Sequence, residues 1–320
     1  MTVIYFLERS LILKKKRLGF GVFIICCLSL VCLFGCHSKK QSHDKGLHIV
    51  TSFYPIYAMT KYVSGDLNDV RMIRSSAGIH SFEPSPNDVA AIYEADLFVY
   101  HSHTLESWAG DLDANSHHSD VKVLEAGKTL KLQRVAGLED IKADKGIDPA
   151  TLYDPHTWSD PLLAADEADV IAAKLSQVDP EHKAIYQKNA SRFRKEANKI
   201  YKDYEKKFKT VSSRTFVTQH TAFSYVAKRF GLTQLGIAGI SPEQEPTARQ
   251  LKETRDFINT YKVKTIFVES NVSPKIAQTV AKSTGAKLKM LSPLEADPKN
   301  NRTYLDNIKA NLDILYQELK

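Results

Sequence analysis

The chain has 320 residues, which is too long for one small core and favours two domains. With 43% hydrophobic and 25% charged residues, it has the composition of a globular protein. Of its formal net charge of +7, residues 1–35 supply +4 through five basic residues and one acidic residue, which leaves +3 for the rest. A charge spread thinly over the rest excludes the concentrated basic face that nucleic-acid binding needs.

The cysteines gather at the start of the chain. Cys26, Cys27, Cys32 and Cys36 precede 284 residues that contain none. A disulfide framework and a thiolate metal site are therefore both excluded from the body of the protein.

Residues 1–35 are predicted to be a lipoprotein signal peptide. A basic stretch, 14–17, precedes an apolar stretch, 18–34. Leu33-Phe34-Gly35-Cys36 then resembles a bacterial lipobox, which would place a lipid on Cys36, and the polar residues up to Gly46 suit a tether, 36–46. The apolar stretch is also long enough to compete as an uncleaved membrane anchor, for which roughly 18 residues is the threshold. Either interpretation puts the bulk of the protein on the extracellular face of the cell membrane.

Short apolar runs alternate with amphipathic stretches from Leu47 onward. Runs rich in Val, Ile, Leu and Phe predict strands at 47–53, 70–75, 97–101 and 121–124. Helix-like segments at 56–63 and 86–94 lie between them. Strands that alternate with helices predict α/β units with mainly parallel sheets, here an N-terminal lobe over residues 47–179.

One long helix is predicted next, over residues 180–210. Asp179 can cap its start, and Pro180 suits the first helical position. Apolar residues recur at helical spacing among Lys and Glu, at Ile185, Phe193, Ala197, Ile200, Tyr204 and Phe208. Such a stripe on a polar helix predicts that it lies along both lobes, with a surface helix of one lobe as the alternative.

A second α/β series follows in residues 211–320, predicted as the C-terminal lobe. Its strands are expected at 215–219, 234–237, 265–269 and 287–291, and its helices at 222–230, 247–261, 274–283 and 304–319. The predicted fold is α/β, with two lobes with mainly parallel sheets joined by one long rigid helix.

Three of the eleven histidines stand out: His80 and His220 lie in loops after predicted strands, and His156 lies in another turn-rich segment. Such loops are where α/β proteins build their sites. A carboxylate from Glu295 or Asp297, after the last strand, completes a set with two candidate ligands from each lobe. The pair His117-His118 falls in a polar stretch that we interpret as a solvated surface loop.

Several segments carry a family resemblance over essentially the whole chain after Cys36. They include Gly78-Ile-His-Ser-Phe-Glu-Pro84, Tyr153-Asp-Pro-His156, Thr218-Gln-His-Thr-Ala-Phe-Ser-Tyr225 and Ser292-Pro-Leu-Glu295. With these, the chain resembles the zinc- or manganese-binding lipoproteins of ABC transporters (cluster A-I), and especially the streptococcal zinc-binding lipoproteins also called laminin-binding proteins.

That resemblance implies two α/β lobes bridged by a long helix, with one metal ion held by His80, His156, His220 and Glu295. Manganese relatives have a carboxylate at the third position, whereas three imidazoles and one carboxylate suit tetrahedral Zn²⁺. Glu83 is expected either to orient His80 as a hydrogen-bond acceptor or to cap the helix that begins near Pro86.

The function predicted is extracytoplasmic capture of Zn²⁺ and its delivery to an ABC-type zinc importer, without covalent chemistry. The expected partners are the transporter permease and, through the lipid anchor, the membrane; we expect a monomer and no nucleic acid. A zinc hydrolase is the first rival, but a fourth protein ligand would fill the position that a catalytic water needs. Adhesion to laminin is retained as a second role of the same surface protein.

Overall fold

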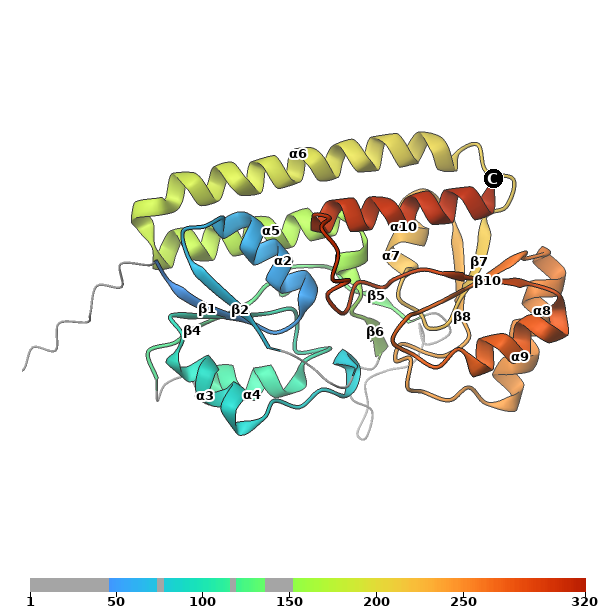
Figure 1. The fold of residues 1–320 in the computed structure, drawn as a ribbon, viewed down its shortest axis with the longest axis horizontal. Helices are drawn as coiled ribbons and strands as arrows, with labels where there is room; N and C mark the ends of the chain where they lie inside the picture. The colour runs from blue at the N-terminus through green and yellow to red at the C-terminus, as the bar shows by residue number, and fades with distance from the viewer. Residues whose placement is uncertain (1–45, 74–77, 116–118, 136–151) are drawn as a thin grey trace, which may run out of the picture. The chain divides into compact units, whose positions relative to one another are not determined.

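The computed structural model describes residues 46–73, 78–115, 119–135 and 152–320, with only the backbone at 113–115 (Figure 1). The predicted signal peptide, Cys36 and the His117-His118 pair lie outside these residues. Lys45–Lys320 forms one compact unit. No helix among the described residues has both the length and the apolar character needed to cross a membrane.

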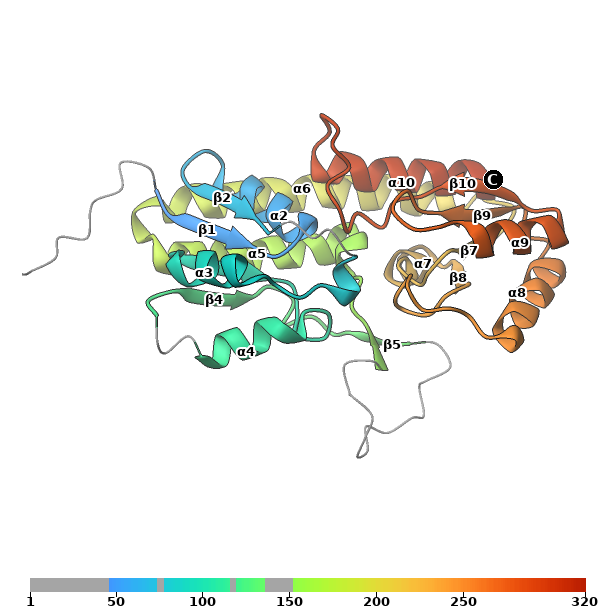
Figure 2. The same ribbon diagram turned by 60° about the horizontal axis from the view of Figure 1, so that its bottom comes forward.

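The first sheet is parallel and has the order β2-β1-β3-β4. Its strands are β1 (His48–Thr51), β2 (Asp69–Met72), β3 (Leu97–Tyr100) and β4 (Lys122–Glu125). All four predicted strands are present, although the end of the one expected at 70–75 falls outside the described residues. Helix α2 (Tyr54–Ser64) contacts one face of this sheet, and α3 (Pro86–Glu94) and α4 (Ser107–Asn115) the other (Figure 2).

The second sheet repeats this plan. Its strands are β7 (Thr215–Thr218), β8 (Thr233–Gly236), β9 (Thr265–Val268) and β10 (Lys287–Met290), all parallel, in the order β10-β9-β7-β8. If each sheet is numbered from its own first strand, both have the order 2-1-3-4. The helices are α7 (Ser224–Phe230), α8 (Ala248–Tyr261), α9 (Lys275–Thr284) and α10 (Tyr304–Leu319), as predicted to within two residues at each end.

Two long helices connect the sheets. Helix α5 (Pro161–Val178), which the sequence analysis did not identify, begins where the Asp160 side chain accepts hydrogen bonds from two backbone N–H groups. Helix α6 (Lys183–Phe208) follows it and packs against α5 and α2 in the first half of the chain and against α7 and α10 in the second. The prediction that this helix lies along both halves is therefore confirmed.

Two details of the predicted helix were wrong. Within the described part of the chain, the side chain of Asp179 accepts no hydrogen bond from a backbone N–H, and Pro180–His182 forms a 3₁₀ turn before α6 begins. Its carboxylate instead accepts hydrogen bonds from His182 Nδ1 at 2.8 Å and from the Tyr186 hydroxyl at 2.5 Å. Ile185 is 41% exposed, and the neighbouring Tyr186 is buried in its place. The buried stripe is thus shifted by one residue at the start of the helix.

One apolar core joins both halves. It combines Ile49 of β1, Phe216 of β7 and the buried faces of α5, α6 and α10. Separate clusters cover the opposite face of each sheet, around Phe98 in the first and Ile266 in the second. A small antiparallel pair, β5 (Gln133–Arg134) and β6 (Tyr153–Asp154), lies in the connection before α5.

Candidate metal centre

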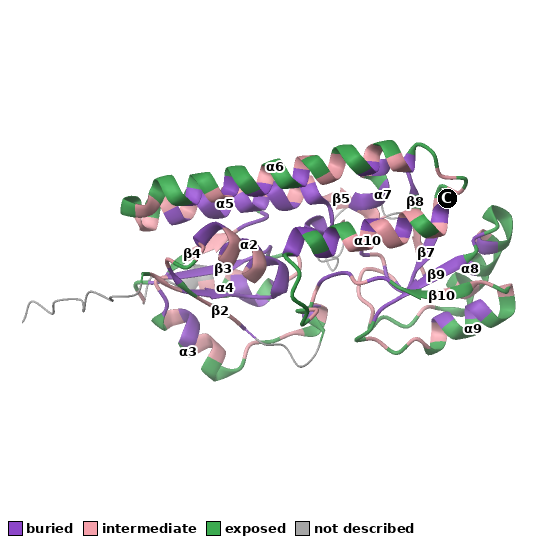
Figure 3. Ribbon diagram, turned by 45° about the horizontal axis from the view of Figure 1, so that its top comes forward, coloured by how far each residue is buried: buried purple, intermediate pink, exposed green. Residues whose placement is uncertain are grey.

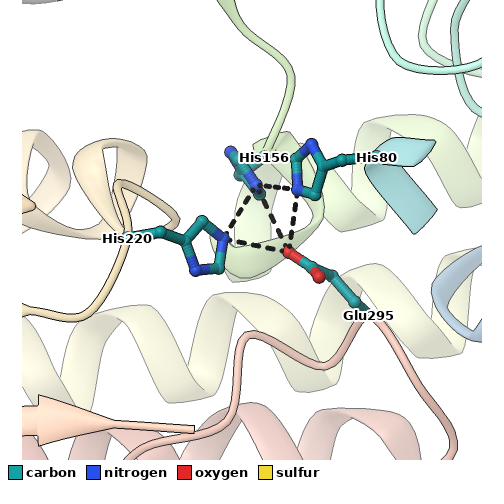
Figure 4. Close-up of side chains that lie close together, drawn as sticks. All are labelled: His80, His156, His220 and Glu295. Carbon is teal, nitrogen blue, oxygen red and sulfur yellow. Dashed lines mark hydrogen bonds and ion pairs between the residues drawn. The ribbon is translucent and has the colours of Figure 1, made fainter. Parts of the chain in front are cut away.

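Four side chains from four separate loops meet at one point (Figure 4). His80 lies in a 3₁₀ turn, Ile79–Ser81, and His156 lies two residues after β6. His220 lies two residues after β7, and Glu295 five residues after β10. Two of the four come from each half of the chain, as expected from the sequence.

The ligand atoms have tetrahedral spacing. Bonds of about 2.0–2.1 Å to a zinc ion give a tetrahedron with edges of about 3.3–3.4 Å. The Nε2 atom of His156 lies 3.3 Å from that of His80 and 3.4 Å from that of His220. Glu295 Oε1 lies 3.4, 3.4 and 3.1 Å from Nε2 of His80, His156 and His220. The ligand atoms of His80 and His220, the sixth pair, lie within 4.8 Å of each other. Five of the six edges therefore match those of a zinc tetrahedron.

Burial differs among the four groups. The side chains of His156 and His220 are fully buried, whereas those of His80 and Glu295 retain 6% and 12% of their exposure. Solvent thus reaches the centre on the side of His80 and Glu295. A single carboxylate also halves the ion's double charge, which lowers the cost of holding it in a largely buried place.

A second carboxylate supports each fully buried histidine. Asp154 Oδ1 lies 2.7 Å from His156 Nδ1, and Glu269 Oε1 lies 2.5 Å from His220 Nδ1. Each Nδ1 therefore donates its hydrogen to a carboxylate, so that the neutral ring, once Nε2 has lost its proton, directs the Nε2 lone pair toward the centre. Asp154 also accepts a hydrogen bond from the Ser224 hydroxyl of α7.

Sequence reasoning missed both supporting carboxylates, although signals for them existed. Asp154 stands two residues before His156, and Glu269 directly follows β9. Strands β7 and β9 are neighbours at the position where the strand order of the second sheet reverses, which is where ligands bind in such sheets.

These carboxylates control the protonation of the empty centre. Burial alone would lower the pKa of His220, but its hydrogen bonds to Glu269 and Glu295 raise that pKa to about 10. Burial is likewise outweighed at His156, where the charge of Asp154 raises the pKa. Burial would raise the pKa of Glu295, yet the three histidines hold it well below its ordinary value. A metal ion must therefore displace protons from imidazoles.

The loop that carries Glu295 is attached to the loop that carries His156. Trp158 donates a hydrogen bond from Nε1 to the Pro293 carbonyl at 2.9 Å, and its own carbonyl accepts one from the Tyr304 hydroxyl at 2.7 Å. Leu294, next to Glu295, has a φ of +59°, an unusual value for a bulky residue, which the buried side chain stabilises by packing. These contacts hold Glu295 opposite the histidines.

The remaining sequence candidates lie elsewhere. Asp297 accepts a hydrogen bond from the backbone N–H of Lys299 and is not in the cluster. Glu83 is exposed and, among the described residues, makes no hydrogen bond to His80; Ser85 caps α3. His101 and Glu167 form a further buried pair, in which His101 Nδ1 lies 3.1 Å from Glu167 Oε2. Because His101 Nε2 also lies 2.8 Å from the Pro155 carbonyl oxygen, this pair holds the loop that carries His156.

Comparison with known proteins identifies the family. The family model described as "Zinc-uptake complex component A periplasmic" matches residues 49–318. The chain is 38% identical to the high-affinity zinc uptake system protein ZnuA of Bacillus subtilis, over 93% of this chain and 97% of that protein. This chain belongs to that family. The family is one of uptake components and not of enzymes.

Solved structures of relatives have the same fold. A Zn(II)-bound variant of AdcAII of Streptococcus pneumoniae matches 86% of this chain and 99% of its own, with 64% identity and a TM-score of 0.82. The laminin-binding protein Lmb of Streptococcus agalactiae matches 86% and 100%, with 64% identity and a TM-score of 0.79. The chain spans 61% of the length of another relative, the zinc-binding lipoprotein AdcA of S. pneumoniae.

Proposed function

We propose that this chain binds one Zn²⁺ outside the cytoplasm through His80, His156, His220 and Glu295 and delivers it to the permease of an ABC-type importer. The observation that carries the proposal is the spacing of the three Nε2 atoms and Glu295 Oε1, in which five of the six separations are 3.1–3.4 Å, as in a zinc tetrahedron. Membership of a zinc-uptake family and the Zn(II)-bound relative support the choice of metal.

The donor set favours reversible capture over hydrolysis. Catalytic zinc sites keep one coordination position for water. If all four side chains bind the ion, that position is filled and no nucleophile forms. The zinc ion is thus the cargo of the protein.

We also propose the arrangement in the cell. Residues 1–35 act as a signal peptide, Cys36 carries the lipid, and 36–46 tether an N-terminal lobe (47–179), the linking helix (180–210) and a C-terminal lobe (211–320) to the membrane. Adhesion to laminin is a second candidate function, because the similar Lmb protein is described as having both adhesin and metal-transporting activity.

Metal content tests the proposal most directly. A soluble chain that begins after Cys36 is stripped of metal, loaded with zinc, desalted and analysed by elemental mass spectrometry. We expect about one zinc per chain, and its loss in a His156→Ala, His220→Ala double variant. A matched double variant, His48→Ala and His103→Ala, removes two histidines that also pair with carboxylates but lie outside the centre, and should keep the zinc. Zinc retained equally by all three proteins would overturn the assignment.

A further inference from the structure

Helix α6 carries a row of lysines along its outer side. The row consists of Lys188, Lys195, Lys199, Lys202, Lys206 and Lys209. After a first gap of seven residues, in which Arg192 lies, the separations alternate between four and three residues. We call these six residues the lysine stripe. At about 100° per residue they fall within an arc of about 80°, and at ~1.5 Å per residue the stripe is roughly 32 Å long.

The stripe lies opposite the face of α6 that packs on the protein. The buried residues of the helix, among them Phe193, Ala197 and Tyr204, occupy the other side, and Figure 3 shows the exposed residues of α6 along its outer edge. All six lysines are exposed, and none forms an ion pair with another described residue. The exposed acidic residues of the helix, Glu196 and Asp203, fall at one edge of the stripe. The net charge of this chain is therefore less evenly spread than its composition suggests.

The chain leaves the compact unit close to the start of this helix. The backbone N–H of Leu47 donates to Asn68 Oδ1 at 2.8 Å, and Asn68 Nδ2 donates to the hydroxyl of Tyr186, in the first turn of α6, at 2.9 Å. Leu47 is eleven positions after Cys36, so even a fully extended tether reaches about 40 Å. An anchor on Cys36 therefore keeps Leu47 within that distance of a bilayer, and the start of α6 lies close to Leu47.

We propose that the lysine stripe is a docking surface for a membrane that carries anionic phospholipid headgroups. The lysine stripe and an anionic membrane surface are complementary in charge, and the stripe is straight and long enough to span several headgroups. The tether brings the start of α6, at one end of the stripe, close to the bilayer. Basic residues close to an anionic membrane are attracted within a Debye length, about 8 Å at physiological salt. The inference rests on the proposed lipid-anchored location, and it adds an orientation to it.

Docking through this face has a consequence for zinc transfer. The stripe faces away from the rest of the protein, so a docked chain presents its metal centre away from the bilayer, which suits capture of zinc. Delivery to a permease then requires release of the stripe.

Vesicle co-sedimentation tests the proposal. The probe protein is the zinc-loaded chain from residue 46, since relatives whose whole solved chains match 86% of this one fold without the remainder. Vesicles of phosphatidylcholine alone are compared with vesicles that contain about 30% phosphatidylglycerol, at low salt and at about 0.3 M NaCl. The stripe variant replaces Lys195, Lys199, Lys202 and Lys206 with Gln. A control variant with the same net charge replaces Lys122, Lys228, Lys275 and Lys282, which are exposed and lie elsewhere.

We expect binding to the anionic vesicles alone, weakened by salt, and lowered roughly 1,000-fold at low salt in the stripe variant, on the basis of the attraction of its four lysines. The control variant should bind as the parent chain does, and both variants should still hold one zinc, which separates this test from that of the metal centre. Equal loss in the two variants would mean that only net charge matters and would overturn the proposal. Binding to a soluble polyanion such as polyphosphate, without binding to anionic vesicles, would also overturn it.

Discussion

The two fully buried histidines of the metal centre each have a carboxylate on the far side of the ring. Asp154 fixes His156 and Glu269 fixes His220, whereas no described residue hydrogen-bonds to Nδ1 of His80. Two of the histidine ligands are thus held rigidly, each with a carboxylate hydrogen-bonded to the Nδ1 side of its ring. We infer that His80, on the side open to solvent, is the ligand with the most freedom to move during entry and release of the ion.

Glu269 gives a prediction about protons. In the empty site His220 is protonated at neutral pH, because its pKa is raised to about 10, and zinc must displace the proton from Nε2. Affinity should therefore increase with pH throughout the neutral range, about tenfold per unit for each proton displaced. In Glu269→Gln the pKa of His220 should fall, so fewer protons are released, and affinity at high pH should drop about 10–100-fold with the loss of the supporting carboxylate.

Titration calorimetry in buffers with different ionisation enthalpies measures this proton release directly. Glu253→Gln, a change of an exposed carboxylate on α8, serves as the matched control and should release as many protons as the parent chain. The interpretation fails if Glu269→Gln and the parent chain release the same number of protons on binding zinc.

The four central residues could be predicted from the sequence, but their supports could not. His80, His156, His220 and Glu295 stand in the short motifs that carry the family resemblance, so one sequence suffices to find them. Asp154 stands only two residues before His156, but the local turn decides whether its carboxylate meets the ring. Whether Glu269 meets a given ring depends on how loops far apart in sequence pack. Glu269 is 49 residues from His220, and the parallel pairing of β7 with β9 brings them together.

At the scale of elements, buried strands were the clearest prediction. Strands such as Leu97–Tyr100 are buried on both faces, so they appear as continuous apolar runs with polar boundaries. Helix α5 was not predicted, although its start carries the same Asp-Pro signal, Asp160-Pro161, as the one that led to the prediction of α6 at Asp179-Pro180. Conversely, Asp179 shows that a residue of the right type does not cap a helix when side-chain donors, here His182 and Tyr186, compete for its carboxylate.

The small residues of α5 give a prediction at this scale. Ala164, Ala165, Ala168 and Ala172 are buried in the core that joins both halves. Ala168→Leu should therefore overpack this core and lower the free energy of unfolding by about 1–3 kcal/mol. Ala173, one turn along the same helix, is exposed, and Ala173→Leu should change stability by less than about 0.5 kcal/mol.

Urea unfolding of the metal-free proteins, followed by circular dichroism, compares the two variants under identical conditions. Equal stability of Ala168→Leu and the parent chain would show that α5 has room at this position, and the account of a tightly packed connection between the halves would then fail.

At the scale of the whole molecule, the shared core has a thermodynamic consequence. Ile49 of the first sheet and Phe216 of the second belong to one apolar cluster that α5, α6 and α10 complete, and Trp158 is hydrogen-bonded to residues of the second half. Two lobes with separate cores would unfold separately, whereas a continuous core couples them. Residues 46–320 should therefore unfold in one transition.

Thermal unfolding tests this coupling and the zinc site together. Tryptophan fluorescence reports on the first half through Trp108 and on its contact with the second half through Trp158, while circular dichroism reports on all helices. We expect coincident transitions from the two probes.

Zinc at about a thousandfold excess over Kd should stabilise the folded state by about 4 kcal/mol and raise Tm by on the order of 10 °C. The His156→Ala, His220→Ala variant should lose most of that shift, since zinc binds the folded state through both halves at once. Two separate transitions in the metal-free protein would show instead that the halves are independent domains, and a zinc effect confined to one of them would mean that the ion does not bridge them.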